Sequence, residues 1–133
     1  MRAVLPIMLK QKRGSILSTS SLAGLMCGIA PHSAPYGASK AGVIGRTRHA
    51  AVAYAQDGIR INAIAPGLHD TRPVGVNLTI EESEELKKKL SPAIPMGRFA
   101  EPSEIRGLAV YLASDASSYV TGQVFVQDGG IQA

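Results

Sequence analysis

The chain has 133 residues, 45% of them hydrophobic and 18% charged, and it carries a formal net charge of +4. This composition is that of one globular unit and excludes a disordered chain, which is poorer in apolar residues and more highly charged. The single cysteine, Cys27, excludes an internal disulfide. No apolar run approaches the roughly 18 residues of a membrane helix, and the basic residues neither cluster nor alternate with aromatic residues. We therefore expect a cytoplasmic protein without a membrane or nucleic-acid partner.

Taken in chain order, the hydrophobic patterns predict seven regular elements. They are a helix at 1–12, a strand at 15–20, a helix at 36–56, a strand at 59–65, helices at 79–90 and 102–115, and a strand within 122–130. The stretch at 21–35 is rich in Gly, Pro and Ser and is expected to form a loop, and 66–78 is expected to be irregular.

Turn and cap residues predict where these elements begin and end. Gly14 is expected to end the first helix, and Gly58 the second. Thr79 and Glu82 fit a capping box at the start of a charged helix. Pro102 suits the first turn of the following helix, because proline is tolerated where no backbone N–H is needed.

Short apolar strands that alternate with helices predict an α/β fold, with a parallel sheet covered by helices on both faces. No repeat or linker interrupts the chain, so residues 1–133 are expected to form one unit. Three strands are few for such a sheet. The strand at 15–20 also lacks the charged residues that protect a natural edge strand. We therefore expect this strand to be an interior one, with further sheet on its N-terminal side.

The stretch "SAPYGASKAG" places Tyr36 and Lys40 four residues apart on a predicted helix. Side chains at this spacing share a helix face and lie roughly 5–6 Å apart at Cβ. An ammonium group this close stabilises a phenolate, so the phenol can both give and take a proton. The same spacing also occurs by chance on ordinary helices. The small residues between the two and the hydroxyl cluster "STSS" favour an active site, with Ser20 or Ser21, Tyr36 and the loop after the second strand on one rim of the sheet.

Four motifs, in this order, resemble the short-chain dehydrogenase/reductase family: "GSILSTSSLAG", "YGASKAG", "GIRINAIAPG" and "ASDASSYVTGQVFVQDGG". Together they extend over nearly the whole chain. The resemblance implies a Rossmann-type parallel sheet and an oxidoreductase that uses NAD or NADP on an alcohol or ketone substrate. It also implies assembly as a homo-oligomer.

The resemblance further implies roles for particular residues. Ser21 is similar to the serine that holds the substrate oxygen, Tyr36 to the acid/base, and Lys40 to the lysine that tunes the tyrosine and binds the ribose hydroxyls. The segment "PGLHDT" resembles a family loop that meets the nicotinamide ring and its carboxamide. The implied cofactor contacts are Tyr36, Lys40, Pro66, Gly67, Leu68 and Thr71. The helix at 79–90 resembles a mobile lid over the substrate.

The resemblance covers only the C-terminal half of the family's usual chain. The Gly-rich turn that holds the cofactor pyrophosphate is absent, since no Gly-x-Gly occurs in the sequence. The expected fold is therefore the C-terminal part of a Rossmann-type sheet, with three strands and flanking helices, and without the N-terminal nucleotide-binding half. Cofactor binding by the chain as given is expected to be weak, and the chain is expected to be a truncated, inactive form.

Two functions of different classes remain open from the sequence. In the first, the chain is part of an NAD(P)-dependent oxidoreductase with a Ser-Tyr-Lys site. In the second, it is a non-catalytic remnant or an interaction module that pairs with full-length family subunits through the helix at 36–56. The three histidines share no metal-ligand spacing, so no metal site is expected.

Overall fold

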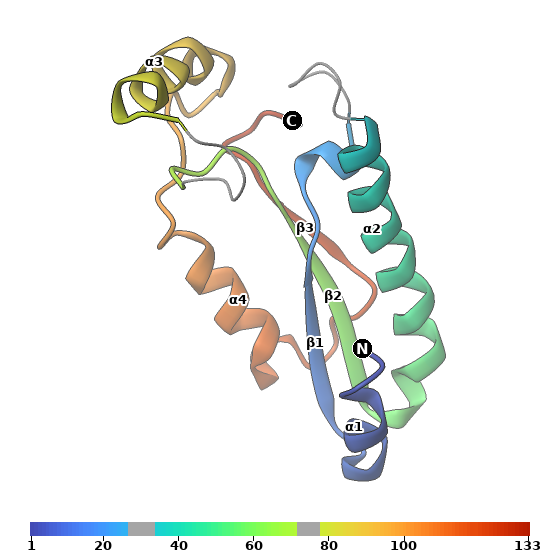
Figure 1. Cartoon of the computed structure of the whole chain (residues 1–133). Coiled ribbons are helices and arrows are strands. Elements are labelled where there is room, and N and C mark those ends of the chain that lie inside the picture. Colours follow the sequence, from blue (N-terminus) through green and yellow to red (C-terminus); the bar gives the residue numbers. More distant parts are fainter. Residues whose placement is uncertain (27–33, 72–77) are drawn as a thin grey trace.

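The computed structural model describes residues 1–26, 34–71 and 78–133. Its helices and strands follow the predicted order (Figure 1): α1 (Leu5–Gln11), β1 (Gly14–Thr19), α2 (Ala34–Tyr54), β2 (Ile59–Pro66), α3 (Ile80–Leu90), α4 (Ile105–Ala113) and β3 (Val124–Gln127). Among the described residues, short 3-10 helices lie between them: η1 (Leu22–Gly24), η2 (Ala55–Asp57), η3 (Ser91–Ala93) and η4 (Asp115–Ser117). Cys27 and His32, together with parts of the predicted loops at 21–35 and 66–78, lie outside the described residues.

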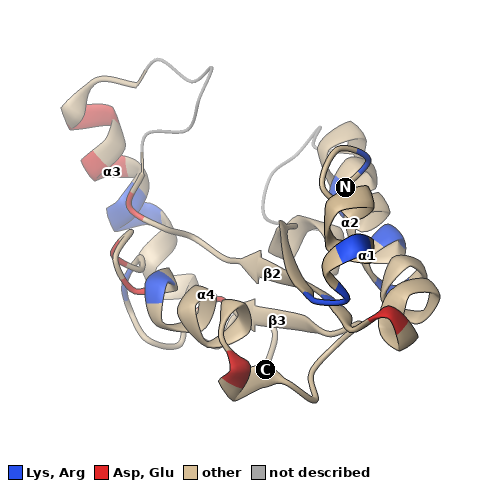
Figure 2. Cartoon of the chain, turned by 90° about the horizontal axis from the view of Figure 1, so that it is seen from below, with Lys and Arg blue, Asp and Glu red and all other residues tan. Residues whose placement is uncertain are grey.

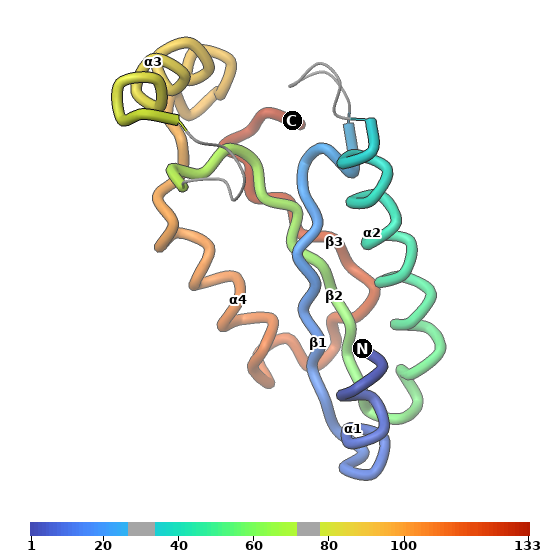
Figure 3. The backbone as a smooth tube through the Cα atoms, viewed as in Figure 1, coloured from blue at the N-terminus to red at the C-terminus, as the bar shows by residue number. Residues whose placement is uncertain are grey.

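The three strands form a parallel sheet in the order β1-β2-β3. Figure 3 traces β2 between the other two strands. Gly14 pairs with Ile59 at one end of the first ladder, and Thr19 pairs with Ile64 at the other. The sheet is covered by α2 on one face and by α4 on the other (Figure 1). The α/β architecture predicted from the alternation of strands and helices is therefore confirmed.

The central strand β2 explains why the sequence folds this way. Its odd-numbered residues, such as Ile61 and Ala63, are fully buried, and so are its even-numbered residues Asn62 and Ile64. A parallel strand that is buried on both faces needs a continuous apolar run, which "IRINAIA" supplies. Asn62 is the polar exception. Its amide donates to the carbonyl of Val120 at 2.9 Å and its carbonyl accepts from the backbone of Gln123 at 3.0 Å, so its burial is compensated.

The expectation that Gly14 ends the first helix is wrong. The helix ends at Gln11, and Lys12 adopts the left-handed conformation, with φ 51°, that usually follows a helix end. Gly14 instead opens β1, where its N–H donates to the carbonyl of Gly58. A Cβ at position 14 would lie 2.8 Å from Met8 Cγ and closer still to its sulfur, so a larger residue here would require this flexible side chain to move.

The expectation that Pro102 lies in the first turn of the next helix is also wrong. Residues 102–104 form turns, and α4 begins at Ile105. The hydrogen bonds from Glu104 N to Glu101 O and from Arg106 N to Ser103 O each span three residues. The segment therefore winds more tightly than an α-helix before α4 begins.

The capping box predicted at Thr79 is present. The backbone N–H of Thr79 donates to Glu82 Oε2 at 2.7 Å, and the backbone N–H of Glu82 donates to Thr79 Oγ1 at 3.1 Å. The helix that follows is acidic in its first turn and basic in its last, as Figure 2 shows. This arrangement opposes the helix dipole at both ends and stabilises α3.

Candidate active site

The candidate residues gather at the carboxyl ends of the strands. At this end of the sheet β1 finishes at Thr19, β2 finishes at Pro66 and α2 begins at Ala34 (Figure 1). In open α/β sheets ligands bind just beyond the carboxyl ends of the strands. The rim predicted from the sequence is therefore formed by neighbouring elements of the fold.

The two serines that follow β1 occupy different environments. Ser20 is buried, and its hydroxyl donates to the backbone carbonyl of Lys40 at 2.8 Å. Ser21 is half-buried, and its hydroxyl oxygen accepts from the backbone N–H of Ala23 at 3.2 Å, which caps η1. The hydroxyl proton of Ser21 is therefore not used by that bond and can be donated to a bound molecule. Ser20, in contrast, ties β1 to α2.

Tyr36 and Lys40 lie on the same face of α2. The ammonium nitrogen of Lys40 is 5.6 Å from the centroid of the Tyr36 ring. The same nitrogen donates to the carbonyl of Thr19 at 3.2 Å, which holds it at the end of β1. The Tyr36 side chain is 50% exposed, so a molecule on the rim can reach it.

Small residues bring η1 into close contact with the start of α2. A Cβ at Gly24 would lie 2.7 Å from the carbonyl carbon of Lys40, and a Cβ at Gly37 would lie 3.0 Å from the carbonyl oxygen of Ala23. From the sequence, the small residues between Tyr36 and Lys40 favour an active site. In the described residues, the chain's own η1 packs closely against this part of α2. Its packing sets the position of Ser21 relative to α2.

The segment after β2 is held by backbone hydrogen bonds on both sides. Gly67 N–H donates to the carbonyl of Gln127 at 2.9 Å, and the carbonyl of Leu68 accepts from Ala100 N–H at 3.0 Å. A Cβ at Gly67 would lie 2.7 Å from the Cα of Asp128, so only glycine fits beside β3. Thr71, at the end of this segment, is exposed.

An ion pair that the sequence analysis missed links this segment to α3. The ammonium of Lys87 lies 2.7 Å from Asp70 Oδ2 and 2.7 Å from Glu84 Oε1. The hydrogen bond with Asp70, followed by that with Glu84, raises the pKa of Lys87 above its ordinary value. The i,i+3 spacing of Glu84 and Lys87 is visible in the sequence. The part played by Asp70 is not, because it depends on where the loop returns to the helix.

A second ion pair lies in the loop that supports the same segment. Arg98 contacts Glu104 through both terminal nitrogens, at 2.7 and 2.9 Å. Glu104 also accepts from the backbone N–H of Glu101 at 2.7 Å. The hydrogen bond from Arg98, and then the one from Glu101, lower the pKa of Glu104 to about 2. This carboxylate therefore stays ionised far into the acidic range.

The described part of the chain contains neither a metal cluster nor a membrane-spanning helix. Within residues 1–26, 34–71 and 78–133, no group of three or more His, Cys, Asp or Glu side chains is arranged to hold a metal ion. Among the helices of those residues, none combines the length and the apolar character needed to cross a membrane.

Comparison with protein families matches residues 1–132 to a model described as enoyl-(acyl carrier protein) reductase. Among curated proteins, the chain is 44% identical over 128 residues to a 3-oxoacyl-[acyl-carrier-protein] reductase from Thermotoga maritima. This alignment covers 96% of the chain and 49% of that protein. It is also 44% identical over 131 residues to a 2-keto-3-deoxy-L-fuconate dehydrogenase from Xanthomonas campestris, and this alignment covers 97% of the chain and 43% of that protein. The chain thus spans about half the length of the curated relatives it matches.

Solved structures give the same result. A short-chain type dehydrogenase/reductase from Mycobacterium marinum superposes with a TM-score of 0.85 at 37% identity, over 99% of this chain and 50% of that one. A 3-oxoacyl-[acyl-carrier protein] reductase with bound NAD from Brucella melitensis has a TM-score of 0.84 at 36% identity, over 99% and 46%. A gluconate 5-dehydrogenase from Burkholderia cenocepacia, in complex with NADP and tartrate, has a TM-score of 0.87 at 32% identity, over 98% and 49%.

The fold and the rim at the strand ends define an α/β protein of the Rossmann type. The chain belongs to the short-chain dehydrogenase/reductase family. The resemblance drawn from the four sequence motifs is therefore confirmed.

Proposed function

We propose that the chain carries the proton-transfer site of an NAD(P)-dependent oxidoreductase that interconverts an alcohol and a carbonyl compound. The observation that carries this proposal is the position of the Lys40 ammonium, which contacts the end of β1 through Thr19 O and lies beside the ring of the exposed Tyr36. Family membership supports the reaction class, and this geometry supports the residues.

The chemistry assigned to the three residues follows from their contacts. A nicotinamide cofactor, when bound, would supply or accept the hydride. Within the described residues the Ser21 hydroxyl donates to no protein group, so its proton can hold the substrate oxygen. During reduction, Tyr36 Oη gives its proton to that oxygen as the carbonyl becomes an alcohol, and the phenolate that remains is stabilised by Lys40. During oxidation the proton moves in the opposite direction.

The residues present fit the nicotinamide end of such a cofactor. An ammonium group has three donors, and Lys40 uses one of them on Thr19 O in the described residues. Two donors therefore remain for ribose hydroxyls. We assign the backbone of Pro66, Gly67 and Leu68 and the hydroxyl of the exposed Thr71 to the nicotinamide side of the same site.

The pyrophosphate end has no counterpart in the sequence, since no Gly-x-Gly turn occurs. Much of the affinity for a dinucleotide comes from its pyrophosphate at a helix N-terminus. We expect the purified 133-residue chain not to oxidise NADH or NADPH with any ketone. Saturable oxidation by that chain would contradict this expectation.

The test of the proposal is a chimera. The first half of the Thermotoga maritima relative would be joined to residues 1–133, which replace the half that they match. We expect the chimera to reduce a simple β-keto ester, such as ethyl acetoacetate, with NADH or NADPH. Tyr36→Phe should lower kcat by at least about 100-fold, the usual size of an acid–base contribution.

The matched control is Tyr54→Phe, which removes the same hydroxyl from the other end of α2. Tyr54 packs against the core beside Ala51 and Ile59 and lies away from the rim. Its substitution should leave kcat within about twofold, as is usual for changes outside the reacting groups. A Tyr36→Phe chimera that binds cofactor and keeps its activity would overturn the assignment.

One observation favours the second function, a module that pairs with full-length family subunits. In the described residues β1 has one strand neighbour, β2, so the backbone groups on its other edge are left for another strand. Hydrogen exchange tests this function. On mixing with a full-length family member, amides of β1 that exchange quickly should become protected. Unchanged exchange in β1 would exclude pairing through this edge.

A further inference from the structure

A pocket of about 560 Å³ opens at the opposite end of the sheet from Tyr36. It lies at the amino ends of β1 and β2, between the loops that precede these strands and the segment that follows α4. Its volume falls within the roughly 300–1,000 Å³ typical of small-molecule sites. The pocket shares no lining residue with the rim described above, and it is independent of the proposed function.

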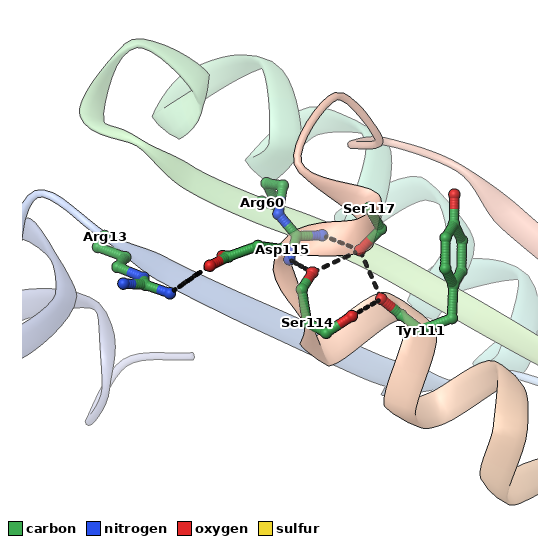
Figure 4. A network of polar contacts seen from close by, with 6 residues as sticks. All are labelled: Arg13, Arg60, Tyr111, Ser114, Asp115 and Ser117. Carbon is green, nitrogen blue, oxygen red and sulfur yellow. Dashed lines mark hydrogen bonds and ion pairs between the residues drawn. The ribbon is translucent and has the colours of Figure 1, made fainter.

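One wall of this pocket is fixed by a polar network, shown in Figure 4. Arg60 donates to the carbonyls of Leu112 and Ser114, both at 3.0 Å, and to the hydroxyl of Ser117 at 2.8 Å. Ser117 is fully buried, and its own hydroxyl donates to the carbonyl of Tyr111. The end of α4 and η4 are therefore held in place. Within the described residues Arg60 contacts no carboxylate, so its positive charge stays unneutralised beside the pocket.

A second guanidinium, that of Arg13, lines the pocket beside Gly14. Its Nη2 lies 3.0 Å from both carboxylate oxygens of Asp115 (Figure 4), while Nη1 and Nε have no partner among the described residues. Both side chains are largely exposed, at 76% and 82%. An exposed ion pair is weak and screened by salt, so a carboxylate from solution can compete with Asp115 for Arg13.

The remaining lining combines hydroxyl donors with apolar surface. Thr121 Oγ1 accepts from the backbone N–H of Ile61 at 3.0 Å, which leaves its hydroxyl proton free to point elsewhere. Tyr119 lines the pocket with a fully exposed ring, although a tyrosine usually buries most of its ring. Ala55 and Ile59 add apolar wall. Of the charged side chains among these lining residues, those of Arg13 and Arg60 are cations and that of Asp115 is an anion.

We propose that this pocket binds a small carboxylate that carries an apolar ring or chain. The carboxylate contacts Arg13, in the field of Arg60, and the apolar part lies against Tyr119 and the wall of Ala55 and Ile59. A neutral molecule of the same shape gains only the apolar contacts. An inorganic anion gains only the charged ones, so neither matches the pocket as a whole.

The test compares benzoate with benzamide, which has the same shape and no charge. The 133-residue chain would be titrated with each, and the backbone amide shifts followed by nuclear magnetic resonance. We expect benzoate to shift amides in 13–15, 58–60 and 113–121, and benzamide to bind at least about tenfold more weakly. Equal binding of the two, or benzoate shifts confined to other residues, would overturn the proposal.

Three variants assign the binding to this pocket. Arg13→Gln should weaken benzoate binding at least about tenfold. Lys12→Gln removes the same charge from the neighbouring residue, which pairs with Asp57 and does not line the pocket, and should leave the affinity nearly unchanged. Asp115→Asn removes the competing carboxylate and should tighten binding severalfold. If Lys12→Gln weakens binding as much as Arg13→Gln, benzoate is responding to net charge and the pocket is not its site. If Asp115→Asn weakens binding, benzoate does not compete with Asp115 for Arg13, and the proposal is equally overturned.

Discussion

The buried hydroxyl of Ser20 donates a hydrogen bond of 2.8 Å to the backbone carbonyl of Lys40. The end of β1 is thereby tied to the turn of α2 that carries the proposed proton-transfer pair. Because Lys40 also donates to Thr19 O, two bonds cross the same junction. The relative position of the serines and of Tyr36 depends on this junction, and its strength can be measured.

Ser20→Ala removes the buried hydroxyl and should lower the free energy of unfolding by about 1 kcal/mol, the usual net contribution of a hydrogen bond. Equilibrium unfolding in urea would measure the loss. Ser39→Ala is the matched control, because it removes an exposed hydroxyl that donates to Tyr36 O in the same helix. That change should stay within about 0.5 kcal/mol. Equal losses in the two variants would show that the junction does not depend on the Ser20 bond.

Two glycine substitutions should have opposite effects on stability. In Gly24→Ala the new methyl group would lie 2.7 Å from the carbonyl carbon of Lys40 and 2.9 Å from Ala41 N, so backbone must move. A loss of about 2 kcal/mol or more is expected, as for other overpacked sites. Gly42→Ala meets no atom within 4 Å and should stabilise α2 by up to about 1 kcal/mol through helix propensity. Thermal melts would compare them. A Gly24→Ala protein as stable as the parent would disprove the close contact between η1 and α2.

The sequence predicted the order of the elements and the parallel sheet, because these depend on local periodicity. The buried strand β2 and the capping box at Thr79 are examples in which short-range pattern and structure agree. The roles of single residues were harder to predict. Gly14 is of a residue type that often ends a helix, but here it opens β1 and lies against the side chain of Met8, which only the packed structure reveals.

The candidate site shows the same division between local and tertiary information. Tyr36 and Lys40 could be paired from their spacing, since one helix sets their separation. The sequence left Ser20 and Ser21 as alternatives on the rim. In the structure Ser20 is buried and bonded to Lys40 O, whereas Ser21 remains half-buried, and this difference depends on how η1 packs on α2. The ion pair of Asp70 with Lys87 joins residues that are distant along the chain, and nothing in their local sequence indicates it.

Stability at acidic pH should depend on Glu104. Its pKa is lowered from 4.5 to about 2, first by Arg98 and then by the backbone of Glu101. A carboxyl with a lowered pKa in the folded state stabilises the fold above its unfolded value, so this contribution is present above about pH 4.5 and is lost as the pH falls towards 2. Glu104→Gln should therefore flatten the fall of the urea midpoint between pH 5 and pH 2.

The control for this pH dependence is Glu85→Gln, which removes the same charge from α3. No ion pair of Glu85 is formed within the described residues. Its variant should therefore keep the acid dependence of the parent. If Glu104→Gln and the parent lose stability in parallel below pH 4.5, the ion pair with Arg98 does not form in solution.

The position of α3 should depend on Lys87. This side chain bonds Asp70 in the segment after β2 and Glu84 in its own helix, both at 2.7 Å. The raised pKa means that the pairing is complete below the ordinary lysine value of 10.5 and is lost only as the pH rises beyond it. The link therefore persists at neutral pH. Lys87→Met keeps the length of the side chain and removes the charge, so the amides of 80–90 should exchange hydrogen faster than in the parent.

Two controls, high salt and a substitution of the neighbouring Lys88, distinguish an effect of the Lys87–Asp70 ion pair on hydrogen exchange from a general effect of charge. Sodium chloride at 1 M reduces the screening length to about 3 Å, so it should speed exchange of α3 in the parent and have little effect in Lys87→Met. Lys88→Met removes the next cation, which is exposed, and should exchange like the parent in low salt. Because Asp70 lies between Leu68 and Thr71, which we assign to the nicotinamide side of the site, a loosened α3 would also change access to the rim. If all three proteins exchange alike in low salt, α3 is positioned by its apolar contacts, and the pair with Asp70 plays no part in positioning it.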